Sequence, residues 1–185
     1  KSDIDWTRVE MFHLDEYVAL PESHPASFRK YLKSRFIDKV QLKQVTLVNG
    51  EAELSGELKR LGEALTAEPI DLGLIGIGEN AHIAFNDPPA DFDTTEPYIV
   101  VNLSDTCKAQ QVHEGWFPTE NDVPRQAISM SVHQIMQCRT ILSFVPYAVK
   151  ANAIKKTLES ACVTNEIPAT KLREHSCVWI YADQD

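Results

Sequence analysis

One short segment, residues 76–89, contains a histidine, two carboxylates and an amide. The imidazole of a histidine can accept a proton and return it during a reaction, which makes His82 a candidate acid/base group. Asp87 or Asn80 can fix the tautomer of its imidazole, as the orienting partner of a catalytic histidine does. The segment follows the apolar, glycine-bounded run 72–77, which is typical of a buried parallel strand. Open α/β sheets bind ligands at the carboxyl ends of such strands, which favours catalysis over the alternative of a hydrogen-bonded structural histidine.

Two further carboxylates, Asp15 and Glu16, follow a predicted strand at residues 8–14. We expect both to lie at the carboxyl end of that strand and to face the same crevice as His82. A carboxylate there can act as a general base on a carbon-bound proton if its pKa is tuned. The pair can equally be a helix N-terminus or a solvated turn.

Two lysines are candidates for binding an anion. Lys150 lies in the first turns of a helix predicted at residues 147–158, where a positive charge opposes the helix dipole unless an anion is bound there. Lys108 lies in a helix predicted at residues 104–112. Either can instead be an ordinary surface lysine.

Strand-like and helix-like segments alternate along the chain, which predicts one α/β domain over residues 1–185 with a mostly parallel sheet and helices on both faces. The predicted strands are 8–14, 45–48, 72–77, 98–103, 127–130, 139–145 and 176–181. The predicted helices are 27–36, 51–67, 104–112, 132–136, 147–158 and 168–173.

The composition limits the classes of partner. Lys and Arg total 18 against 27 Asp and Glu, a formal net charge of -9, which argues against nucleic acid and anionic membranes as partners. No apolar run approaches the roughly 20 residues that span a bilayer, and the polar start shows no signal peptide. The four cysteines show neither close pairing nor metal-type spacing, so we expect a reducing cytoplasm and no metal site.

Residues 14–17 (LDEY) and 76–88 (GIGENAHIAFNDP) together resemble the signatures of the glucosamine-6-phosphate deaminase/isomerase family, which is related to the 6-phosphogluconolactonases. The similarity runs from about residue 4 to residue 183. It implies a modified Rossmann-like α/β fold, no metal and no cofactor, and a sugar phosphate as the partner molecule. The implied reaction is an aldose–ketose isomerisation that releases ammonia, from glucosamine 6-phosphate to fructose 6-phosphate. A homo-oligomer is compatible with this resemblance.

The resemblance also assigns roles. His82 would open the pyranose ring by moving the ring-oxygen proton, with Asp87 orienting it and Asn80 nearby. Asp15 would carry a proton between C2 and C1 through an enolamine intermediate. The residues assigned to substrate or phosphate binding are Lys150, Lys108, Glu16, Gly78 and Ala81.

The chain departs from the family pattern at several points. Ala81 replaces a usual glycine, where a methyl can crowd the sugar or meet a positive φ. Asn80 stands where the best-known members carry Asp, and Asp87 where they carry Glu. The family's first strand and phosphate loop have no counterpart in these residues. Two alternatives therefore stay open: another hexosamine phosphate such as galactosamine 6-phosphate as substrate, or a sugar-phosphate-binding protein without turnover.

Overall fold

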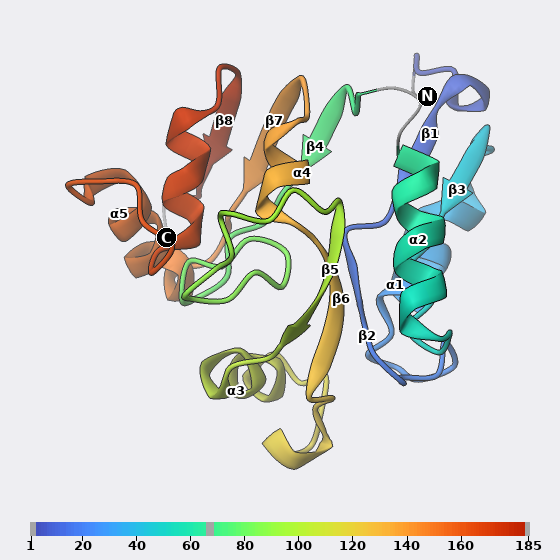
Figure 1. Ribbon diagram of the computed structural model, residues 1–185, viewed down its shortest axis with the longest axis horizontal. Helices are drawn as coiled ribbons and strands as arrows, with labels where there is room; N and C mark the ends of the chain where they lie inside the picture. The colour runs from blue at the N-terminus through green and yellow to red at the C-terminus, as the bar shows by residue number, and fades with distance from the viewer. Residues whose placement is uncertain (1–2, 66–68, 184–185) are drawn as a thin grey trace.

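The computed structural model describes residues 3–65 and 69–183 as strands alternating with helices (Figure 1). The strands are β1 Glu10–Phe12, β2 Asp15–Tyr17, β3 Gln44–Thr46, β4 Leu72–Leu74, β5 Tyr98–Asn102, β6 Gln126–Met130, β7 Thr140–Phe144 and β8 Val178–Tyr181. The α-helices are α1 Phe28–Arg35, α2 Leu54–Leu65, α3 Asp105–His113, α4 Val132–Met136 and α5 Ala151–Glu159. The 3₁₀ helices are η1 Trp6–Arg8, η2 Ile37–Lys39, η3 Glu120–Asp122, η4 Ala148–Lys150 and η5 Pro168–Glu174. In the described residues, no helix is long and apolar enough to cross a membrane.

Two parallel sheets form the α/β framework. Strand β1 pairs with β3, and β7 lies between β4 and β8. Figure 1 shows these strands in the order β3, β1, β4, β7, β8 from right to left, with no described strand paired between β1 and β4. The parallel pairing and the intervening helices confirm the α/β class, and the missing first strand stays a prediction.

The predicted strand at residues 8–14 is wrong in its extent, because the chain changes partner within it. The N–H of His13 still donates to the carbonyl of Thr46, the last residue of β3, at 3.0 Å. The next carbonyl, of Leu14, accepts from the N–H of Met130 on β6, at 2.7 Å. The run therefore divides into β1 and β2, and β2 joins an antiparallel sheet of order β2–β6–β5. The predicted sheet was mostly parallel, and this antiparallel unit is the main departure from it.

A small aromatic core fixes β2 against the segment that follows β4. Tyr17 is fully buried, and its ring centroid lies 5.1 Å from that of Phe85 and 5.4 Å from that of Phe117. Aromatic rings at such separations stabilise each other beyond the area that they bury. The larger core lies under the parallel sheets and includes Ile75 and Ile141. The two cores together hold the end of β4 beside β2.

Within the part of the chain that the structure describes, the β4–β7–β8 sheet is covered on one face only. Ile141 of β7 belongs to one buried cluster with Ala153 of α5 and Leu172 of η5. On the opposite face, Leu74, Phe144 and Trp179 remain 59%, 54% and 58% exposed. The sequence predicted helices on both faces, and among the described residues this sheet has them on one.

Candidate active site

The loop after β4 is shaped around the His82 ring. The N–H of Gly78 donates to the carbonyl of His82 at 3.0 Å, which closes a tight turn. A Cβ added at Gly78 would lie 2.2 Å from Nε2 and Cε1 of His82, so the imidazole lies directly on this glycine. Gly78 therefore leaves room for the ring, and its expected role in substrate binding stays a prediction.

Ala81 occupies the backbone conformation that its usual glycine would favour. Its φ is +68°, and its side chain is fully buried. The left-handed region costs an L-residue roughly 1–2 kcal/mol. Two hydrogen bonds hold it there, from the Ala81 N–H to Gly78 and from the Ala169 N–H to the Ala81 carbonyl, both 2.9 Å. The positive φ anticipated at this position is therefore present, with alanine bearing it.

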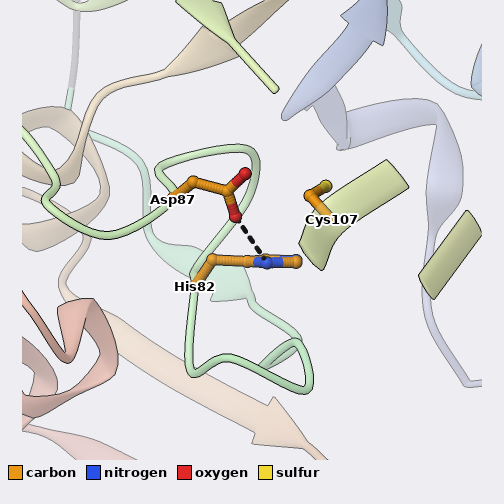
Figure 2. A group of neighbouring side chains, drawn as sticks. All are labelled: His82, Asp87 and Cys107. Carbon is orange, nitrogen blue, oxygen red and sulfur yellow. Dashed lines mark ion pairs between the residues drawn. The ribbon is translucent and has the colours of Figure 1, made fainter. Parts of the chain in front are cut away.

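The hydrogen bonds around His82 define its tautomer. Nδ1 lies 2.7 Å from Oδ1 of Asn80 and 3.1 Å from Oδ1 of Asp87, the contact dashed in Figure 2. The Asn80 amide donates to Asp87 Oδ1 at 2.9 Å, which directs the amide oxygen to the histidine. Since both neighbours of Nδ1 are acceptors, Nδ1 donates to them, which leaves Nε2 as the ring nitrogen that can accept a proton. Asn80 thus orients the ring directly, together with Asp87.

Asp87 is held as an anion at the start of α3. Its Oδ2 accepts from the backbone N–H of Ser104 at 3.0 Å and from the Ser104 hydroxyl at 2.8 Å. Burial acts to raise the pKa of Asp87, but the hydrogen bond and charge of His82, with hydrogen bonds from Asn80 and Ser104, lower it to about 2. A carboxylate beside Nδ1 stabilises the imidazolium that forms when Nε2 accepts a proton.

Asp15 begins β2 and has the pKa of a base poised for neutral pH. It is partly exposed, whereas Glu16 and Tyr17 after it are buried. Burial of the carboxyl group, and then the charge of Glu16, raise the pKa of Asp15 to about 7. Ser129 is its partner across the ladder to β6, and the Ser129 hydroxyl accepts from the N–H of Phe85 at 3.0 Å. Ser129 therefore joins the strand of Asp15 to the loop of His82.

Glu16 is the clearest correction to the expected substrate-binding set. Its side chain is fully buried, and Oε2 accepts from the Ser27 hydroxyl at 2.8 Å and from the Arg29 backbone N–H at 2.9 Å. The Arg29 guanidinium adds an ion pair at 3.3 Å. Glu16 thus anchors the first turn of α1, which leaves it no exposed surface for a ligand.

Lys150 connects to the loop of His82 through a series of polar side chains. It ends η4, which runs directly into α5, so the helix predicted at residues 147–158 begins with a 3₁₀ turn and is α-helical from Ala151. Its Nζ lies 3.3 Å from Oε1 of Glu114, which also accepts from the Gln110 amide at 2.8 Å. The Gln110 oxygen accepts from the N–H of Glu79 at 3.1 Å. Lys108, by contrast, pairs with Asp105 within α3 at 3.3 Å. Among the described residues, it makes no polar contact with Glu114, Gln110 or Glu79.

Comparison with known proteins agrees with this geometry. Residues 1–179 match the model of the family described as glucosamine-6-phosphate isomerases/6-phosphogluconolactonase. The chain belongs to this family. A glucosamine-6-phosphate deaminase of Bacillus cereus (strain G9842) is 37% identical over 186 residues, which cover 100% of this chain and 69% of that protein.

Solved structures of the glucosamine-6-phosphate isomerase/6-phosphogluconolactonase family share the fold. A monomeric glucosamine-6-phosphate deaminase has a TM-score of 0.85 at 30% identity, covering 94% of this chain and 71% of its own. The 6-phosphogluconolactonase of Thermotoga maritima has a TM-score of 0.77 at 14% identity, covering 98% and 76%. The second likeness concerns the fold alone, and both confirm the predicted Rossmann-like class.

Several residues of this family member's site were not singled out from its sequence. Gln110 and Glu114 join the loop to Lys150, and Cys107 lies beside the histidine and aspartate. Ser104 is the N-cap of α3, where its hydroxyl accepts from the N–H of Cys107, and it also donates to Asp87. Helical spacing places 107, 110 and 114 on one side of α3, but only the fold shows that this side meets the loop.

Proposed function

We propose that this chain converts glucosamine 6-phosphate and water into fructose 6-phosphate and ammonia. The observation that carries the proposal is a pair of proton-transfer groups: His82, with its base at Nε2, and Asp15, with a pKa of about 7. Ring opening of an amino sugar and proton transfer between its C2 and C1 need two such groups. The glucosamine-6-phosphate deaminases among its relatives support the same reaction.

His82 serves the first step. Nε2 takes the proton of the C1 hydroxyl and delivers it to the ring oxygen as the C1–O5 bond breaks, leaving an open-chain aldehyde. The imidazolium formed in between is stabilised by ionised Asp87, 3.1 Å from Nδ1. Asn80 keeps the ring in position throughout, since its amide contacts both residues.

Asp15 serves the second step. Its carboxylate removes the C2 proton of the 2-ammonium aldehyde while a proton of the substrate's ammonium group passes to the C1 oxygen, which gives an enolamine, and the carboxylic acid then returns its proton to C1. The product is an imine at C2, which water attacks to release ammonia and the ketose. The raised pKa suits this task because the group must be a base before the transfer and an acid after it.

Lys150 is our candidate for the substrate phosphate. An ammonium group binds phosphate as a point charge. Its present partner is Glu114, so the phosphate has to compete with a carboxylate for the same Nζ. Release of Glu114 would act on Gln110 and, through it, on the Glu79 backbone of the catalytic loop.

The location and assembly of the protein are separate proposals. All four cysteines, Cys107, Cys138, Cys162 and Cys177, are free thiols, which supports the reducing cytoplasm. The net charge of -9 supports a small-molecule substrate over nucleic acid. Homo-oligomerisation stays a prediction, and one solved relative is described as monomeric.

Release of ammonia from glucosamine 6-phosphate tests the function. The 185-residue chain is assayed beside a chimera that carries an added N-terminal strand and phosphate loop taken from a family member, with galactosamine 6-phosphate as the alternative sugar. We expect release from the glucosamine compound, at the higher rate in the chimera if that segment completes the phosphate site. Release from galactosamine 6-phosphate alone would show that this sugar is the substrate. If both protein versions bind a sugar phosphate but neither releases ammonia, the proposed enzymatic activity is contradicted.

Two glycines of the loop provide a matched pair of variants. In Gly78→Ala the new methyl occupies the place of the His82 ring and displaces it, so we expect ammonia release to fall by at least roughly 100-fold. In Gly76→Ala nothing lies within 4 Å of the added Cβ, so we expect activity close to wild type. If the two variants lose ammonia release equally, the loop tolerates neither substitution. The packing of the His82 ring on Gly78 would then not be the cause of the lost activity.

A further inference from the structure

Cys107 adds a third potential metal-ligand atom beside His82 and Asp87. One ligand atom from each of His82, Asp87 and Cys107 lies within 4.8 Å of the other two. Figure 2 shows the three side chains gathered at one place, with the thiol coming from α3 and the other two from the loop after β4. Cys107 is fully buried and His82 is 8% exposed, and the mechanism above does not use the thiol.

The donor set is the one that zinc prefers. Thiolate, imidazole and carboxylate all bind Zn²⁺, at about 2.0–2.3 Å. Donors of a tetrahedral site are then roughly 3.5 Å apart, so closing around the ion requires a movement of about 1 Å. One thiolate and one carboxylate balance the two positive charges, and neutral imidazole adds none. Burial, followed by the charge of Asp87, keeps the pKa of Cys107 well above its usual value, so the thiol is protonated until a metal binds.

An entry route reaches the cluster. A groove of about 1090 Å³ runs between α2, the loop at residues 85–91 and β5, and both Asp87 and Ser104 line it. A buried metal site needs such a path, since the ion must lose its water on the way in. Asp87 is the member of the cluster that lines this groove.

We propose that His82, Asp87 and Cys107 form an inhibitory Zn²⁺ site. Binding replaces the Cys107 S–H bond with a Zn–S bond and releases that proton to solvent, while a ring nitrogen of His82 and a carboxylate oxygen of Asp87 complete the protein ligands. No oxidation or reduction takes place. With zinc bound, the histidine is no longer free to move a proton, so the inhibition rests on the proposed function, whereas the binding does not.

Cobalt substitution tests the binding without any enzyme assay. Titration of the chain with CoCl₂ should give a near-ultraviolet thiolate-to-cobalt absorption band, which ZnCl₂ should abolish by displacing the cobalt. Cys107→Ser should lose the band and bind the metal at least about tenfold more weakly. Cys162→Ser, which removes the exposed thiol, should keep both. Thermal unfolding of each variant checks that it is folded.

Three results would overturn the site: no band in the wild type, a band that persists in folded Cys107→Ser, or a band lost in Cys162→Ser. If the chain releases ammonia, ZnCl₂ should inhibit it, a chelator should restore it, and Cys107→Ser should resist inhibition. Inhibition that is equal in wild type and Cys107→Ser would contradict the inhibitory role. If the chain releases no ammonia, the proposed function fails while the cobalt spectra still decide the site.

Discussion

Asp15→Asn should lower the rate of ammonia release by about 10²–10⁴-fold, the usual contribution of a positioned general base. Asparagine has nearly the size of aspartate, but its amide cannot accept the C2 proton. Binding of the substrate should change little, because the proposed role of Asp15 lies in proton transfer and not in holding the phosphate. Steady-state kcat, with the affinity for an unreactive sugar phosphate, separates the two effects. Wild-type kcat in this variant would exclude Asp15 as the base.

The pKa of Asp15 adds a pH dependence with a definite sign. The ionised form is the active base, and its pKa is raised to about 7, so kcat/KM should rise as the pH increases through 7. For folding, the sign is opposite. A raised pKa contributes stability below the usual value of 3.8, which is lost as the pH rises through about 7. The folded protein is therefore less stable when Asp15 is ionised, which is the form that acts as the base. A kcat/KM profile that is flat from pH 5 to 9 would contradict this assignment.

His82→Asn should lower turnover of the closed pyranose by a comparable factor, about 10²–10⁴. The asparagine amide cannot carry a proton from the C1 hydroxyl to the ring oxygen. The affinity for an unreactive sugar phosphate should change far less, since the proposed phosphate ligand is Lys150. Turnover is measured by ammonia release and affinity by calorimetry.

His113→Asn is the matched control for that change. His113 lies at the end of α3, 3.8 Å from Glu79 of the same loop, with its side chain 71% exposed. It takes no part in the proposed chemistry, so its loss should leave turnover close to wild type. If the two variants lose activity equally, or if His82→Asn loses none, His82 has no place in ring opening.

The sequence predicted the centre of this site well because its information is local. A strand, a glycine turn and a histidine with polar neighbours lie within residues 72–87, and the helix at Val132–Met136 was predicted with the bounds observed. The strand was predicted to be buried, whereas its residues Leu72 and Leu74 are exposed. The positive φ at Ala81 was likewise foreseeable, since a glycine is expected there.

What failed depends on partners distant in sequence. The division of residues 8–14 arises because β6, more than 100 residues later, captures the Leu14 carbonyl. Glu16 became structural because Arg29 and Ser27 take up its oxygens, and no spacing rule identifies that pairing. Cys107 showed no metal-type spacing, yet the start of α3 brings it to the histidine loop. Tertiary packing decides each of these cases.

The most direct test of the account is proton exchange during turnover. Glucosamine 6-phosphate is incubated in D₂O with the wild type, Asp15→Asn and His82→Asn. NMR follows the deuterium content of the remaining glucosamine 6-phosphate and of the fructose 6-phosphate formed, and ammonia release is measured in the same samples. We predict that the wild type exchanges the C2 proton and forms both products, that Asp15→Asn exchanges none, and that His82→Asn is slowed on the closed ring. Two outcomes would contradict proton transfer through Asp15. One is C2 exchange that continues undiminished in Asp15→Asn. The other is product formed by the wild type with no solvent deuterium at C1 or C2, under conditions where Asp15 equilibrates with solvent.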